Sequence, residues 1–253
     1  MALKLSFKTA CYFMHTIIIV CWTILGTALF GLLAIAVSLV SKTGNSAHLV
    51  ARVWGRSILW VSGIRVDIIG LDKEKFDGSC ILMSNHQSNF DIPVLLGMLP
   101  IQFRWLAKAE LFKIPIFGRG MRGAGYISID RSNRSSAIQS LDRAARIIRN
   151  GTSVMIFPEG TRSRDGSLLP FKKGGFIMAV DAGVPIVPMA ISGTHEIMPK
   201  GRLLIRRRNV RVRFQDAIDT RAYTRKTRDD LMTHVRGAIL DGLAETNRGR
   251  TDA

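Results

Sequence analysis

The sequence predicts an α/β protein with a mixed, partly parallel sheet flanked by helices, preceded by an N-terminal two-helix element that anchors it to a membrane. Beyond Arg65, apolar runs of strand length alternate with segments whose apolar residues recur at helical spacing. Ahead of Arg65, residues 9–41 contain no Lys, Arg, Asp or Glu. A run of this length exceeds the roughly 20 apolar residues that a bilayer core requires.

The chain is expected to divide into an anchor, residues 1–63, and a catalytic domain, residues 64–253. A signal peptide is a weaker interpretation of residues 9–41, because its apolar part is only about 7–15 residues long. Positive charges lie on both sides of the run, so they do not fix its orientation. The predicted helix either crosses the bilayer or dips into one leaflet, and both alternatives stay open.

A second helix is predicted over residues 46–63, where Trp54 and Trp60 are interspersed with Arg52 and Arg56. Trp and Arg together are typical of a helix that lies along a membrane surface. An amphipathic helix that packs on the catalytic domain fits this pattern equally well.

The net charge is +17 and the isoelectric point about 10.7. A protein this basic usually contacts nucleic acid, anionic lipid or phosphorylated ligands. Nucleic acid is not an expected partner, because the basic residues are not interleaved with stacking aromatics and no nucleic-acid-binding motif occurs. The lipid bilayer is the expected partner, since its anionic head groups attract each nearby Lys or Arg by about 1 kcal/mol. Residues 206–213 are a candidate contact.

Cys11, Cys21 and Cys80 lie in apolar runs and are expected to be buried hydrophobic side chains rather than disulfide partners. This usage fits a reducing compartment, so we expect the catalytic domain on the cytoplasmic side of the cytoplasmic membrane. No metal site is predicted: apart from His86, the histidines lie in the membrane region or lack neighbouring Cys or paired carboxylates.

Seven strands are predicted, at residues 65–69, 79–84, 103–106, 126–129, 153–157, 186–191 and 210–214. Between the fourth and fifth lies an amphipathic helix that Ser132 or Asn133 can cap and Gly151 can close. This strand–helix–strand unit predicts that at least part of the sheet is parallel. A long C-terminal helix is predicted over about residues 224–245.

Polar clusters follow three of the predicted strands where each strand ends. They are His86, Asp130-Arg131, and the run Glu159-Gly160-Thr161-Arg162. Open α/β sheets bind ligands beyond the carboxyl ends of their strands. If these strands are mutually parallel, the three clusters share one edge of the sheet and form one site.

His86 is the candidate general base, because imidazole can take a proton from a hydroxyl near neutral pH. Asp91 can fix its tautomer and stabilise the imidazolium that forms. Asp91 also precedes Ile92-Pro93, where it could cap a helix. It can do one or both, and the sequence leaves this open.

The run after the fifth strand suits an anion. Gly160 permits a tight turn that exposes backbone N–H groups, Thr161 adds a hydroxyl, and Arg162 offers a planar fork matched to phosphate. Arg131 and Lys108 are further cations for the same group. Taken singly, each is equally well an ordinary polar surface residue. The sequence shows no Gly-x-Ser-x-Gly elbow, Walker loop or dinucleotide fingerprint, so the set suits direct attack of a lipid hydroxyl on an activated acyl group.

Four motifs in order resemble those of the 1-acyl-glycerol-3-phosphate acyltransferases, members of the glycerolipid acyltransferase superfamily. They are the His-x4-Asp motif in residues 85–91, followed by residues 125–131, 157–163 and 184–188. The resemblance covers about residues 81–193. The second motif departs from the family pattern at Ser128, where an aromatic residue is common, which bears on contacts with the glycerol side of the substrate.

The resemblance implies that the sn-2 hydroxyl of lysophosphatidate attacks the thioester of acyl-CoA or of acyl carrier protein, giving phosphatidate without any cofactor. His86 would be the base, oriented by Asp91. Phosphate binding would fall to Glu159, Gly160, Thr161 and Arg162, with Arg131 and Lys108. Val187 and Pro188 would shape the acyl side.

Three alternatives stay open. The acceptor could be glycerol-3-phosphate or a lysophospholipid with another head group, because the motifs do not separate these substrates. A membrane-anchored phospholipid hydrolase would use the same base to activate water. A basic membrane scaffold without activity would leave the clustering of polar motifs after strands unexplained.

Overall fold

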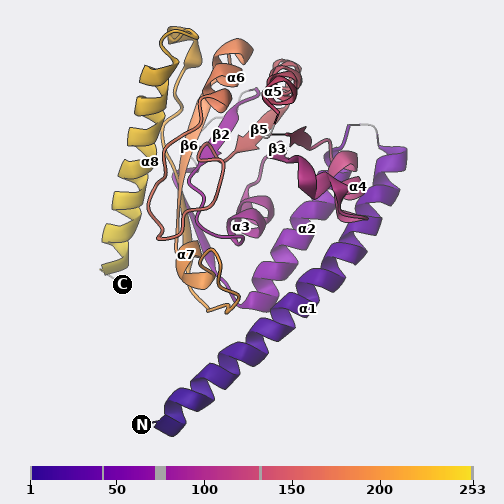
Figure 1. Ribbon diagram of the computed structural model, residues 1–253, viewed down its shortest axis with the longest axis vertical. Helices are drawn as coiled ribbons and strands as arrows, with labels where there is room; N and C mark the ends of the chain where they lie inside the picture. The colour runs from indigo at the N-terminus through magenta and orange to yellow at the C-terminus, as the bar shows by residue number, and fades with distance from the viewer. Residues whose placement is uncertain (1, 42, 72–77, 131–132, 252–253) are drawn as a thin grey trace.

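The computed structural model describes residues 2–41, 43–71, 78–130 and 133–251. A seven-stranded sheet lies between two layers of helices, as Figure 1 shows. One layer contains α1 (Ala2–Val40), α2 (Asn45–Ser62) and α3 (Asp91–Met98), with α4 (Phe117–Gly123) packed against α1. The other contains α5 (Arg134–Arg149), α6 (Gly174–Ala182) and α8 (Arg228–Thr251). The short elements η2 (Ala109–Lys113), α7 (Thr194–Ile197) and η3 (Thr220–Ala222) lie in connections.

All seven predicted strands are present, in the spatial order β1-β7-β6-β2-β5-β3-β4. They are β1 (Val66–Ile69), β2 (Ile81–Ser84), β3 (Phe103–Lys108), β4 (Ile127–Ile129), β5 (Ser153–Ile156), β6 (Ile186–Ser192) and β7 (Val210–Phe214). The five strands from β6 to β4 are mutually parallel, whereas β7 runs antiparallel to β6 and β1 runs parallel to β7. The mixed sheet is therefore confirmed, and the carboxyl ends of β2, β4 and β5 lie at one edge.

Strand β2 illustrates why the central strands are apolar at every position. Leu82 belongs to the hydrophobic cluster under α2 and α3, and its neighbours Ile81 and Met83 belong to the cluster under α5, α6 and α8. All four residues of β2 are buried. A parallel strand covered on both faces needs consecutive apolar residues rather than an alternating pattern.

Helix α5 connects β4 to β5, and β3 lies between these two strands. Asn133 caps the helix by accepting a hydrogen bond from the Ser136 N–H at 3.0 Å. Gly151 follows the helix with φ 88°, a conformation that glycine adopts without steric cost. The cap is therefore Asn133; the alternative, Ser132, lies outside the described residues.

Helix α1 runs uninterrupted for 39 residues, and its N-terminal end projects beyond the rest of the molecule in Figure 1. In the described part of the chain, it is the one helix long and apolar enough to cross a membrane, with a mean hydropathy of 2.4 over Ala10–Val40. Of the predicted two-helix membrane element, α1 alone is therefore a candidate membrane-spanning helix among the described residues. Helix α2 is shorter, contains two arginines, and buries Gly55, Ile58 and Leu59.

The N-terminal helices share a hydrophobic core with the sheet. Ile19 of α1 and Leu59 of α2 belong to the same cluster as Leu82 of β2. Gly31 allows the close approach of α4, because a Cβ at this position would lie 2.7 Å from the Cγ2 of Ile116. Hydrophobic packing therefore continues across residue 63, where the predicted anchor meets the predicted catalytic domain.

All three cysteines are free, but the predicted burial is correct for only one of them. Cys80 is buried beside β2, but Cys11 and Cys21 are exposed on α1. The reason is that α1 covers the protein with one side only, so the other side presents its apolar residues outward.

Candidate active site

His86 and Asp91 form the centre of the site. The Nδ1 of His86 lies 2.7 Å from the Oδ2 of Asp91, whose side chain is fully buried. The same oxygen accepts hydrogen bonds from the backbone N–H groups of Gln87 at 2.7 Å and Ser88 at 2.9 Å. Asp91 is the first residue of α3. The carboxylate turns back to hold the loop and the imidazole, and its bond to the Ser88 N–H also ties the start of the helix to that loop, so Asp91 serves both predicted purposes.

The imidazole of His86 is fixed on a second side by an aromatic ring. Its ring stacks on Phe157, with centroids 3.9 Å apart and planes 6° apart. Because Nδ1 faces a carboxylate, it carries the proton in the neutral ring, and Nε2 keeps a lone pair. The ring lines a large cavity. The imidazole that Asp91 and Phe157 hold in place is therefore part of the cavity wall.

The side chain of Glu159, which was predicted to help bind the phosphate, does not line the cavity. Its Oε1 accepts a hydrogen bond from the His86 backbone N–H at 2.6 Å, and its Oε2 accepts one from the Leu169 N–H at 2.9 Å. The residue is 2% exposed. Burial raises its pKa to about 7, against the effect of these two hydrogen bonds. Both oxygens are engaged by backbone groups, so the geometry assigns the carboxylate to holding the His86 loop.

The rest of the motif after β5 lies where the prediction places it. Gly160, Thr161 and Arg162 line the same cavity as His86. Gly160 has φ 74°, as expected of the glycine in a tight turn. The ammonium of Lys200 donates to the Thr161 hydroxyl and to the Arg162 carbonyl, both at 3.0 Å. The sequence analysis missed Lys200, which lies 38 residues after Arg162 in a loop without a recognisable motif.

Lys108 and Arg131 were also predicted to contact the phosphate. Lys108, at the end of β3, lines the cavity and forms an ion pair with Glu110 at 3.0 Å, with both side chains more than half exposed. Arg131 lies outside the described residues.

The cavity extends from His86 into the helical layer and has a volume of about 910 Å³. The part of its lining that comes from α1, α2 and α4 is almost entirely apolar. This part includes Ile19, Thr23, Phe30, Gly31, Ala34, Ala47, Trp54, Gly120 and Ala124. The small residues keep the space open, and their clustering in the first predicted helix was the signal that could have indicated it.

Val187 and Pro188 do not line this cavity, and their predicted acyl-side role stays a prediction. Both lie in β6, which pairs with β2 on one side and β7 on the other. Val187 is 2% exposed within the core cluster under α3. Their apolar character is explained by their central position in the sheet.

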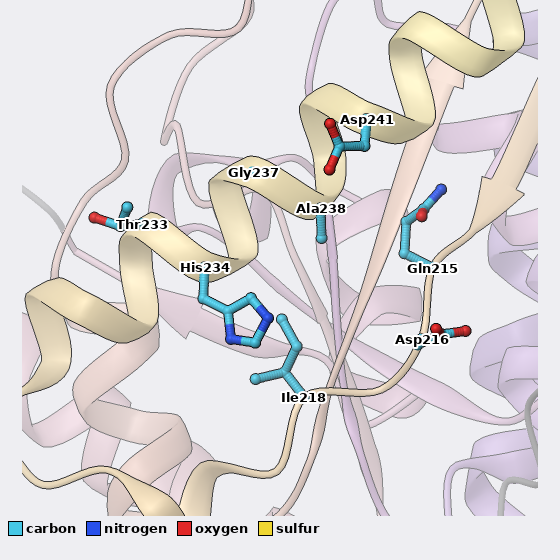
Figure 2. Close-up of a pocket in the computed structure, with 8 residues that line it drawn as sticks. All are labelled: Gln215, Asp216, Ile218, Thr233, His234, Gly237, Ala238 and Asp241. Carbon is cyan, nitrogen blue, oxygen red and sulfur yellow. The ribbon is translucent and has the colours of Figure 1, made fainter.

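A smaller hollow of about 310 Å³ lies between α8 and the segment after β7, as Figure 2 shows. His234 from α8 faces Ile218 there, and Gln215 and Asp216 line the opposite side. The Nδ1 of His234 lies 3.0 Å from the Tyr223 hydroxyl, which gives the ring a structural partner. In the described ranges no group of three or more His, Cys, Asp or Glu could hold a metal ion, here or at His86.

Comparisons with known proteins agree on one kind of protein. Residues 65–192 match a family described as Acyltransferase. A 1-acyl-sn-glycerol-3-phosphate acyltransferase from Limnanthes douglasii is 36% identical over 202 residues, covering 79% of this chain and 71% of the relative. One of the same name from Haemophilus influenzae is 33% identical over 205 residues, covering 81% and 84%. The crystal structure of the 1-acyl-sn-glycerophosphate acyltransferase PlsC from Thermotoga maritima is similar with a TM-score of 0.82 and 26% identity, covering 95% of this chain and 98% of that one.

Proposed function

This chain belongs to the acyltransferase family, and we propose that it transfers an acyl group from a thioester to the sn-2 hydroxyl of lysophosphatidate, giving phosphatidate. The donor is acyl-CoA or acyl carrier protein. The names of the relatives support the acceptor. The observation that carries the proposal is the position of the His86–Asp91 pair. His86 lines the cavity between its apolar part and a cationic opening, called the mouth below, which is formed by Gly160, Thr161, Arg162 and Arg202.

The chemistry follows from the orientation of the imidazole. The Nε2 of His86 takes the proton of the acceptor hydroxyl while the hydroxyl oxygen attacks the thioester carbonyl carbon. Asp91 stabilises the imidazolium that forms. When the C–S bond breaks, the imidazolium returns the proton to the leaving thiolate. An ester and a free thiol result, and no covalent acyl-enzyme is needed.

The two ends of the site suit the two ends of a lysophospholipid. Gly160, Thr161 and Arg162 present a backbone turn, a hydroxyl and a guanidinium at the mouth, which suit a phosphate group. The apolar interior beyond His86 suits a fatty acyl chain. The cavity thus accounts for an amphiphilic substrate.

The lipid substrates of this reaction lie in a membrane, which α1 is suited to contact. Helix α1 presents large apolar side chains outward, among them Leu25, Leu29 and Leu39. This surface fits the acyl region of a bilayer. The free state of the three cysteines fits a catalytic part on the cytoplasmic side of the cytoplasmic membrane.

A thiol-release assay on vesicle-embedded protein tests the proposal. Acyl-CoA is supplied with lysophosphatidate, with glycerol-3-phosphate, with other lysophospholipids, or with no acceptor. We expect release that depends on lysophosphatidate, and phosphatidate as the product. Equal release without acceptor would instead identify a hydrolase, a preference for another acceptor would identify a sister acyltransferase, and no release would indicate a scaffold.

A further inference from the structure

Three cations at the mouth of the cavity have no ion-pair partner among the described residues. Arg162 and Arg202 line the cavity, and Lys200 contacts two residues of that lining, Thr161 and Arg162. None of the three cations takes part in the ion pairs found in the described part of the chain. The two oxygens that Lys200 contacts, a hydroxyl and a carbonyl, are neutral. Bringing like charges together costs free energy unless an anion compensates them. The arrangement therefore indicates an anionic ligand.

Lys200 is held in place rather than loosely attached to the surface. Its loop joins α7 to β7 and is anchored at both ends. Near the start, the Ser88 hydroxyl of the catalytic loop donates to the Met198 carbonyl at 2.8 Å. Near the end, the Ile205 N–H donates to the Thr16 hydroxyl of α1 at 3.0 Å. The loop thus bridges the catalytic loop and α1 across the mouth.

The ammonium has one donor left for a ligand. Lysine carries three N–H donors, and two of those of Lys200 are directed at Thr161 and Arg162. Thr161 and Arg162 are the same residues that the proposed function assigns to the phosphate. Lys200 therefore holds the shape of the phosphate loop and adds a charge to it.

We propose that Lys200, with Arg202 beside it, is a further binding residue for a phosphate group at the cavity mouth. The inference rests on the proposed function, which supplies two sources of that chemistry. One is the phosphate of lysophosphatidate, and the other is the set of phosphates on the CoA donor. Either source would use the same charge-assisted hydrogen bonds.

The test compares Lys200→Met with Lys200→Arg, and with Lys226→Met as a matched control on an exposed lysine at the start of the α8 region. Binding of lysophosphatidate and of 1-monoacylglycerol, which lacks the phosphate, is measured by titration calorimetry on protein in vesicles. Binding of acyl-CoA and of acyl-pantetheine is measured in the same way. Because these are equilibrium measurements, they test Lys200 independently of turnover, which tests the proposed function separately.

We expect Lys200→Met to weaken binding of one phosphate-bearing ligand about 10- to 100-fold, and Lys200→Arg to restore most of it. Loss confined to lysophosphatidate, with monoacylglycerol unaffected, places the acceptor phosphate at Lys200. Loss confined to acyl-CoA, with acyl-pantetheine unaffected, places the donor phosphates there. Unchanged binding of both phosphate ligands overturns the inference, and so does an equal loss for the ligands without phosphate, because that result indicates only a structural role.

Discussion

The two walls of the cavity are built by different physics. On the sheet side, His86 lines the cavity, and the buried carboxylates of Asp91 and Glu159 behind it hold backbone N–H groups and the imidazole at distances between 2.6 and 2.9 Å. On the helix side, residues such as Ile19, Phe30 and Ala34 meet the cavity through apolar contact alone. Hydrogen bonds are directional and fix atoms in place, whereas apolar packing is not directional. Substitutions on the sheet side should therefore change the rate, and those on the helix side should change which substrate fits.

The largest effect is expected from His86→Ala, which removes the base from the sheet-side wall. Turnover should fall by about 10²–10⁴-fold or more, while binding of lysophosphatidate stays close to that of the wild type. Thiol release and calorimetric binding measure the two quantities. Near-normal turnover by this variant would remove His86 from the mechanism and with it the contrast between the walls.

Asp91→Asn should give the next largest loss. The amide can still accept hydrogen bonds from the loop, but it cannot compensate the positive charge on the imidazole. We expect turnover to fall by roughly 10²-fold or more, with the Michaelis constants little changed. If the loss appeared in the Michaelis constants instead, Asp91 would act mainly by shaping the loop.

Glu159→Gln should reduce turnover by roughly 10- to 100-fold, because the His86 backbone loses part of its clamp. Glu245→Gln, at an exposed ion pair with Arg213, serves as the control. An effect only on the Michaelis constant for lysophosphatidate would restore the phosphate-binding role predicted from the sequence.

The same variant should alter the pH dependence of stability. The folded pKa of Glu159, about 7, lies above its ordinary value of 4.5. The folded state therefore binds the proton more tightly than the unfolded state, and this group's contribution to stability is lost as pH rises from about 4.5 through 7. The difference in Tm, wild type minus Glu159→Gln, should be larger at pH 5 than at pH 8. An opposite trend would mean that the ionised carboxylate is favoured in the fold.

The smallest effect is expected on the helix-side wall. Ala34→Leu adds a branched side chain to the apolar lining that the helices contribute to the cavity. Turnover of the longest acyl chains should therefore fall several-fold relative to shorter ones. Overpacking of this kind typically costs about 1–3 kcal/mol of stability, so the chain-length ratio is the measurement. Leu25→Ala, on the exposed side of α1, is the control. A uniform loss at all chain lengths would contradict the proposal that the helix-side wall determines which acyl chain fits.

The sequence predicted the parts of this molecule whose signal is local. Consecutive apolar residues gave the strands, and the rule that ligands bind beyond strand ends brought His86 and Arg162 to one edge. The direction of a side chain was less accessible. Glu159 beside a glycine and an arginine is equally consistent with a ligand contact or with a backbone clamp, and its partner Leu169 is ten residues away.

Contacts between distant segments account for the other misses. Lys200 reaches the site only because its loop is anchored to Ser88 and Thr16, and neither contact leaves a pattern in the sequence. Hydropathy identified α1 as an anchor but gave no sign that its inner side would line the cavity. The acyl-side role of Val187 and Pro188 comes from family resemblance and stays a prediction, although the sheet already explains their apolar character.

Helix α1 contributes both to the outer surface of the protein and to the wall of the cavity. Ile19 and Ala34 face the protein, while Leu25 and Leu29 face outward. A fragment that lacked this helix to gain solubility would also lose one wall of the cavity. In the proposed function, the helix that attaches the protein to the membrane also forms a wall of the substrate cavity, so a substitution along α1 would affect attachment and substrate binding together.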